Sequence, residues 1–92
     1  MNWTPPPDYV YHPHVLDQLA RHGLKPLPTT APERLREALN DLYRHEIRTA
    51  RANLLAGRIE RSRYAGHILE LRQRYWLLSL PVARWIAGGD LP

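Results

Sequence analysis

The fold is decided by residues 31–75, which read APERLREALNDLYRHEIRTARANLLAGRIERSRYAGHILELRQRY. On both sides of Gly57, apolar side chains recur every three or four residues, which is the spacing of amphipathic α-helices. Gly57 itself is typical of a helix end, because glycine adopts the left-handed backbone conformation that ends many helices. The stretch therefore predicts an antiparallel helical hairpin, with helices over about 31–56 and about 60–77.

The apolar positions of the two predicted helices also match each other in register. If the turn is centred near residue 59, residues whose numbers add up to about 118 lie opposite each other. Four pairs along the hairpin are then apolar on both sides: Leu54 with Tyr64, Ala50 with Ile68, Ile47 with Leu71, and Tyr43 with Tyr75. This agreement is the main evidence for two helices that pack against each other.

One charged pair falls within the apolar seam. Glu46 of the first predicted helix and Arg72 of the second both lie among the apolar positions and face each other in this register. We expect a partly buried Glu46–Arg72 ion pair that fixes the register and adds little net stability. A catalytic or ligand-binding carboxylate is the weaker interpretation, because no second acid or nucleophile is placed near Glu46.

Two short helices are expected to cover the hairpin. Pro13 suits the first turn of a helix and Gly23 suits its end, so a helix is predicted over about 13–22. Pro81 precedes a run of apolar residues in the same way, which predicts a last helix over about 80–87. Together with the hairpin, these elements predict an all-α fold.

The two ends of the chain are expected to extend from this helical unit. Three consecutive prolines at 5–7 favour an extended N-terminal arm over residues 1–12. Residues 88–92 follow the last predicted helix as a tail. Because 92 residues are the size of one small domain, we predict a single helical domain over residues 1–92.

Composition excludes several classes of protein. The chain has no cysteine, which removes disulfides, cysteine zinc sites and thiol nucleophiles. Its start lacks the basic flank and apolar segment of a signal peptide, and no apolar run has the length of a membrane span. We therefore expect a cytoplasmic protein without membrane contact.

The sequence predicts neither a catalytic centre nor a metal or cofactor site. His12, His14, Asp17 and His22 resemble metal ligands in type, but they do not converge on one helix face as four zinc ligands must. The serines and threonines next to predicted helix starts are explained by capping rather than by nucleophilic catalysis. We expect no enzyme activity.

Arginine side chains concentrate on the hairpin. The chain has 13 basic residues, and all of them except Lys25 are arginines. Six form a stripe along the first predicted helix and a cluster around the turn: Arg44, Arg48, Arg51, Arg58, Arg61 and Arg63. A solvated helix face, an acidic protein partner and nucleic-acid phosphates all fit this pattern.

Trp76 and Trp85 belong to a second candidate surface, an apolar corner near the C-terminus. In so small a protein, part of such a corner is expected to stay exposed and to contact a partner.

These features predict a non-catalytic accessory or adaptor protein. It would bind another protein through the basic hairpin face and the tryptophan corner, and it could also form a homodimer. The alternative is a nucleic-acid-binding helical protein that uses the stripe of Arg44, Arg48 and Arg51. No residue pattern in the chain carries the signature of a known family.

Overall fold

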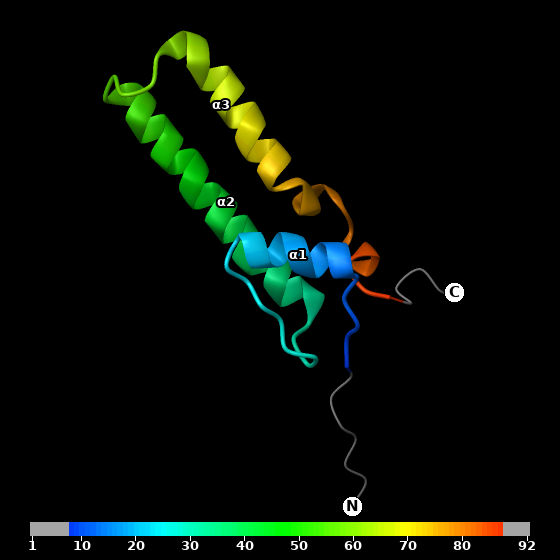
Figure 1. The fold of residues 1–92 in the computed structure, drawn as a ribbon. Coiled ribbons are helices and arrows are strands. Elements are labelled where there is room, and N and C mark those ends of the chain that lie inside the picture. The colour runs from blue at the N-terminus through cyan, green and yellow to red at the C-terminus, as the bar shows by residue number, and fades with distance from the viewer. Residues whose placement is uncertain (1–7, 88–92) are drawn as a thin grey trace, which may run out of the picture.

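The computed structural model describes residues 8–87, and every regular element in this range is helical. Three α-helices are followed by two short 3-10 helices (Figure 1): α1 (Pro13–Arg21), α2 (Pro32–Leu55), α3 (Arg61–Arg74), η1 (Trp76–Ser79) and η2 (Val82–Arg84). The predicted all-α class is confirmed. Within the described range, β-type pairing is limited to one isolated antiparallel bridge between Tyr11 and Ile86.

The helices α2 and α3 lie side by side and are joined by the turn at residues 56–60 (Figure 1). Gly57 has a φ of 76°, the left-handed conformation that a side chain disfavours. The backbone N–H groups of Arg58 and Ile59 both donate to the carbonyl oxygen of Asn53, at 2.8 and 3.3 Å, and so satisfy a carbonyl of the last turn of α2. We call α2, α3 and this turn the helical hairpin.

The hydrophobic core lies at the end of the molecule away from the hairpin turn, where α1 crosses the first half of α2 (Figure 1). Its buried side chains come from α1, α2 and η1, and from the segments before α1, after α3 and after η2: Tyr11, Val15, Leu19, Leu35, Leu39, Tyr75, Leu77 and Trp85. Beyond this cluster the outer part of the hairpin buries only Ala50 and Leu71 among its described apolar residues. The core and the projecting hairpin are therefore packed very differently.

The molecule is elongated as a result. Its principal extents are 62 × 26 × 19 Å, and its radius of gyration is 17.0 Å. A compact chain of this length has a radius of gyration of about 12 Å. The outer part of the hairpin thus projects from the core with both of its faces open to solvent or to a partner.

The return helix is shorter than the sequence predicts. α3 ends at Arg74 instead of continuing to residue 77, because Tyr75 leaves the helical conformation with φ −104° and ψ 32°. The 3-10 helix η1 follows and turns Leu77 into the core, where it is 2% exposed. A continuous α-helix would have carried Leu77 along the line of α3 and away from α1.

The predicted helix over 80–87 is also corrected. The structure has only the three-residue η2 there, because the backbone after it pairs with the N-terminal segment. The N–H of His12 donates to the carbonyl oxygen of Trp85 at 3.1 Å, and the N–H of Ala87 donates to that of Val10 at 2.6 Å. These groups would otherwise belong to a helical ladder.

Part of the predicted N-terminal arm is described. Residues 8–12 are non-helical, and Tyr9 donates its N–H to the carbonyl oxygen of Pro28 at 2.7 Å. The hydroxyl of Tyr11 donates to the carbonyl oxygen of Thr30 at 2.6 Å. The rest of the predicted arm, residues 1–7, and the predicted tail, residues 88–92, lie outside the described residues.

Arg36 ties the segment after α3 to α2. Its Nη1 donates to the carbonyl oxygen of Leu80 at 2.7 Å, and its Nη2 donates to that of Leu78 at 2.9 Å. The carbonyls at the end of a short helix have no partner within it, so the half-buried guanidinium supplies one. Arg36 thereby holds η1 in place over the core.

Substituting Arg36 tests this contact. We expect Arg36→Ala to lower the free energy of unfolding by about 2 kcal/mol, because it removes two charge-assisted hydrogen bonds in a partly buried setting. Arg34→Ala, two residues away on the exposed side of α2, is the matched control and should change stability by less than about 0.5 kcal/mol. Urea denaturation of both variants measures the difference, and equal effects would contradict the role given to Arg36.

Ionisation of Tyr11 makes the free energy of unfolding depend on pH in the alkaline range. Burial, and then the negative charge of Glu33, raise the pKa of Tyr11 to about 12. The phenol is therefore easier to ionise in the unfolded chain, so its contribution is fully present below pH 10 and is lost as the pH rises to about 12.

We expect the free energy of unfolding of Tyr11→Phe to fall less between pH 10 and 12 than that of the wild-type chain. Phenylalanine lacks the ionising hydroxyl, and two pKa units correspond to roughly 2–3 kcal/mol. Denaturant unfolding across this pH range is the measurement. An unchanged pH dependence would show that Tyr11 is not the group responsible.

Candidate protein-binding groove

An apolar groove runs between α2 and α3 on one side of the hairpin. Its floor is formed by Tyr43 and Ile47 of α2 and by Tyr64 and Ile68 of α3, and it encloses about 420 Å³. Each helix contributes two side chains four residues apart, the spacing that places them on the same face. All four are only partly buried, so the floor is accessible from outside.

Arginines form the rim of this groove. Arg44 and Arg48 border it from α2, and Arg72 borders it from α3. All three are exposed, and none forms an ion pair with another residue of the described range 8–87. No acidic side chain of that range lines the groove. The site therefore combines an apolar floor with an unneutralised positive rim.

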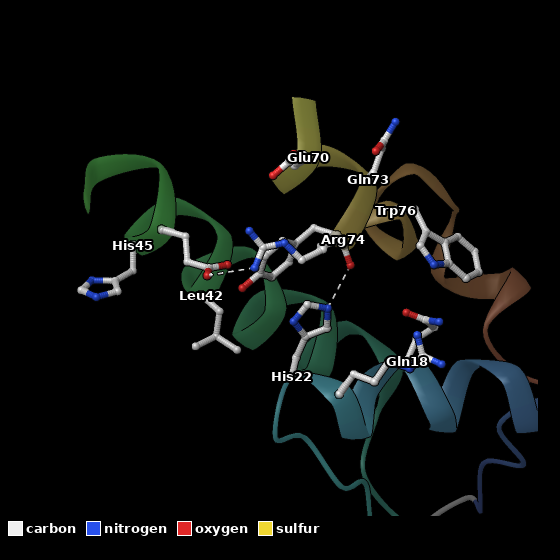
Figure 2. A pocket seen from close by; sticks show the side chains of 11 residues that line it. Gln18, His22, Leu42, His45, Glu70, Gln73, Arg74 and Trp76 are labelled. Atoms are coloured by element: carbon white, nitrogen blue, oxygen red, sulfur yellow. Dashed lines mark hydrogen bonds and ion pairs between the residues drawn. The ribbon is translucent and has the colours of Figure 1, made fainter. Parts of the chain in front are cut away.

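A larger cleft of about 830 Å³ lies between α1 and the hairpin (Figure 2). Its lining includes charged side chains of both signs, Arg21, Glu46, Glu70 and Arg74. Its wall is held together by a hydrogen bond at 3.0 Å between Nε2 of His22 and the carbonyl oxygen of Arg74 (Figure 2). The ring of His22 also packs on Tyr75, with centroids 4.3 Å apart. These contacts join the end of α1 to the end of α3.

The predicted Glu46–Arg72 pair is wrong. Glu46 instead forms an ion pair with Arg74, with 4.0 Å between Oε1 and Nη1, and both side chains remain substantially exposed. Burial, followed by a hydrogen bond to Glu46, raises the pKa of Tyr75 above its ordinary value. Arg72 projects from another side of α3, because two residues along a helix turn the side chain by about 200°.

The six arginines singled out from the sequence are all exposed: Arg44, Arg48, Arg51, Arg58, Arg61 and Arg63. Two of them make local contacts near the turn. Nη1 of Arg58 donates to Oδ1 of Asn53 at 3.3 Å, and Nε of Arg63 lies 3.9 Å from Oε2 of Glu60. The structure brings only Arg44 and Arg48 to the groove, where Arg72 joins them. The register of the apolar positions instead predicts that Arg72 pairs with Glu46.

The tryptophan corner divides into a surface residue and a core residue. Trp76 is half-buried and stacks on the ring of His14, with centroids 6.4 Å apart. Trp85 is 0% exposed and belongs to the core. The prediction that Trp85 contacts a partner is therefore wrong, because the pairing of residues 85–87 with residues 10–12 turns it inward.

No three His, Cys, Asp or Glu side chains in residues 8–87 are grouped so that they could hold a metal ion. In the same range, no helix has both the length and the apolar character needed to cross a bilayer.

Comparison of the chain with models of known families, with curated proteins and with solved structures finds no match.

Because the ion pair between Glu46 and Arg74 is exposed, substituting Glu46 tests how much this pair contributes to stability. We expect Glu46→Ala to lower the free energy of unfolding by less than about 1 kcal/mol, because a solvent-exposed ion pair contributes little. Thermal or urea unfolding is the measurement. A cost of about 3 kcal/mol would instead indicate the buried pair expected from the sequence.

Proposed function

We propose that this protein is a non-catalytic accessory or adaptor protein of the cytoplasm, and that the helical hairpin of α2 and α3 is its binding element. The partner is another protein, which places a helical segment with apolar and acidic side chains in the groove between α2 and α3. The observation that carries this proposal is the apolar floor bordered by three exposed arginines.

The residue types of the groove support a protein partner. Tyrosine and arginine are enriched among the residues that contribute most to protein–protein binding. An amphipathic helix that lies in a groove inserts side chains spaced three or four residues apart. The two tyrosines and two isoleucines of the floor offer contacts at that spacing, and the arginine rim favours acidic residues on either side of the inserted stripe.

The sparse packing of the outer part of the hairpin also supports a protein partner. Its outer part buries only Ala50 and Leu71 among the described residues, so much of the apolar surface of both helices is accessible. A segment bound in the groove would cover the floor and add packing to both helices. Such a ligand would stabilise the folded chain by mass action.

Nucleic acid is the second candidate, and the six exposed arginines of the hairpin favour it. The two candidates differ in their response to salt. Binding through about six phosphate contacts should weaken about a thousandfold between 50 and 200 mM salt. Binding anchored by the apolar floor should change far less, because burial of apolar surface is not screened by ions.

A direct test uses labelled model ligands and fluorescence anisotropy. One peptide carries leucines at helical i, i+3, i+4 and i+7 positions flanked by glutamates; a matched peptide has lysines in place of the glutamates. Single-stranded and double-stranded DNA oligonucleotides complete the set. We expect the glutamate peptide to bind and the lysine peptide to bind at least tenfold more weakly, because the rim is positive.

Arg72→Glu should weaken binding of the glutamate peptide about tenfold, because it reverses one charge of the rim. Arg34→Glu changes the net charge equally on the part of α2 outside the groove, and it should leave the affinity within about twofold. Equal binding of the two peptides would contradict the proposal. Tight, strongly salt-dependent binding of an oligonucleotide would favour the second candidate.

A further inference from the structure

The outward face of α2 carries charges that are sorted by sign along the helix. Three acids occupy its first half and three arginines its second half: Glu33, Glu37, Asp41, Arg44, Arg48 and Arg51. At 100° per residue these six positions fall within an arc of about 80°. All six side chains are exposed. We call this face the charged stripe.

The charged stripe is unpaired within the described chain. The ion pairs found in residues 8–87 join Arg21 to Asp17, Arg63 to Glu60 and Arg74 to Glu46. None of them includes a residue of the stripe. The stripe therefore has the full set of its charges available for an external partner.

The spacing of like charges within each half of the stripe is unfavourable for an isolated helix. Like charges stand three or four residues apart within each half of the stripe, and such pairs destabilise a helix slightly. The helix dipole favours acids only in the first turn and bases only in the last. Asp41 and Arg44 lie in the middle of α2, so the dipole does not account for the whole pattern. A partner whose charges run in the opposite order would account for it.

We propose that this partner is a second copy of the chain, whose α2 packs antiparallel against the charged stripe about a two-fold axis near residues 42 and 43. An antiparallel copy reverses the order of the charges, so each acidic half meets an arginine half. Three kinds of contact form on each side of the axis: Glu33 with Arg51, Glu37 with Arg48, and Asp41 with Arg44. In each pair the residue numbers add up to 84 or 85, which is the condition for one common axis.

The same surface serves both subunits, as a two-fold interface requires. The first two contacts join residues at nearly the same angle on α2, namely Glu33 with Arg51 and Glu37 with Arg48, and an antiparallel pair places equal angles side by side. The interface is mostly polar and its ion pairs stay near solvent. The dimer should therefore be weak and sensitive to salt.

Sedimentation analysis of the wild-type chain gives the first test. In about 20 mM salt we expect the average mass to rise above 10.7 kDa as the protein concentration increases. In about 300 mM salt it should return towards the monomer, because screening weakens charge pairs. A chain that stays monomeric at high concentration in low salt would overturn the proposal.

Charge reversal identifies the surface. Glu37→Arg and Arg48→Glu should each abolish self-association, because each places like charges opposite one another. The double variant with both changes should restore it, since the pair is then re-formed in reverse. All these positions are exposed, and circular dichroism verifies that each variant folds. Failure of the double variant to associate while both single variants remain folded would contradict the antiparallel pairing.

Arg72→Glu is the matched control for Arg48→Glu, because it changes the net charge equally but lies on α3 outside the charged stripe. We expect it to leave self-association unchanged while it weakens the binding of the glutamate peptide. Loss of self-association in Arg72→Glu would assign the dimer to the groove rather than to the stripe. Arg44 and Arg48 belong both to the charged stripe and to the rim of the groove, so Arg72→Glu is the variant that separates the two surfaces.

Discussion

The burial of Trp85 is the constraint on which the rest of the structure depends. This side chain is 0% exposed and packs in one cluster with residues of α1, α2 and the segment after α3. Its Nε1–H has no hydrogen-bond partner within the described chain, which costs about 1–3 kcal/mol for a buried donor. The large apolar area of the indole ring offsets that cost. Trp85 joins helices that are distant in the sequence.

Several features follow from placing Trp85 inside. The chain must return from the end of α3 to the core, which requires the break at Tyr75 and the short η1. The return leaves backbone carbonyls without helical partners, and Arg36 binds two of them. The backbone around Trp85 then pairs with the segment before α1. Most of the large buried apolar side chains belong to this core. The outer hairpin therefore has little buried surface, and the groove between its helices stays open.

The parts of the fold that depend on local spacing could be predicted from the sequence. The helical period located α2 and the start of α3, and Gly23 and Gly57 adopt the left-handed conformation expected at helix ends. Tyr43 and Tyr75 also face each other, with ring centroids 5.2 Å apart. Each of these features is encoded within a few turns of one helix or in the matched apolar positions of two.

The parts that depend on tertiary contacts could not be predicted. The apolar period does not distinguish a tryptophan in the core from one on a surface. It therefore predicts Trp85 on a partner-binding surface, whereas this residue is buried. Glu46 pairs with Arg74 instead of Arg72 because these two arginines project about 200° apart around α3, and matching residue numbers across the hairpin does not fix which of them faces Glu46. The same ambiguity hid the groove, since Arg72 becomes part of a rim only once the orientation of α3 is fixed. No local sequence pattern predicts that the backbone of residues 85–87 pairs with that of residues 10–12.

The bridge between Tyr11 and Ile86 has a topological consequence. Because the N–H of Ala87 donates to the carbonyl oxygen of Val10 at 2.6 Å, two residues near the ends of the described range lie next to each other. A host protein interrupted by residues 10–87 would need to span only the gap of one backbone hydrogen bond. Adjacent ends of this kind are what allow a folded unit to be inserted into a surface loop of another polypeptide, here with the hairpin projecting from the core (Figure 1).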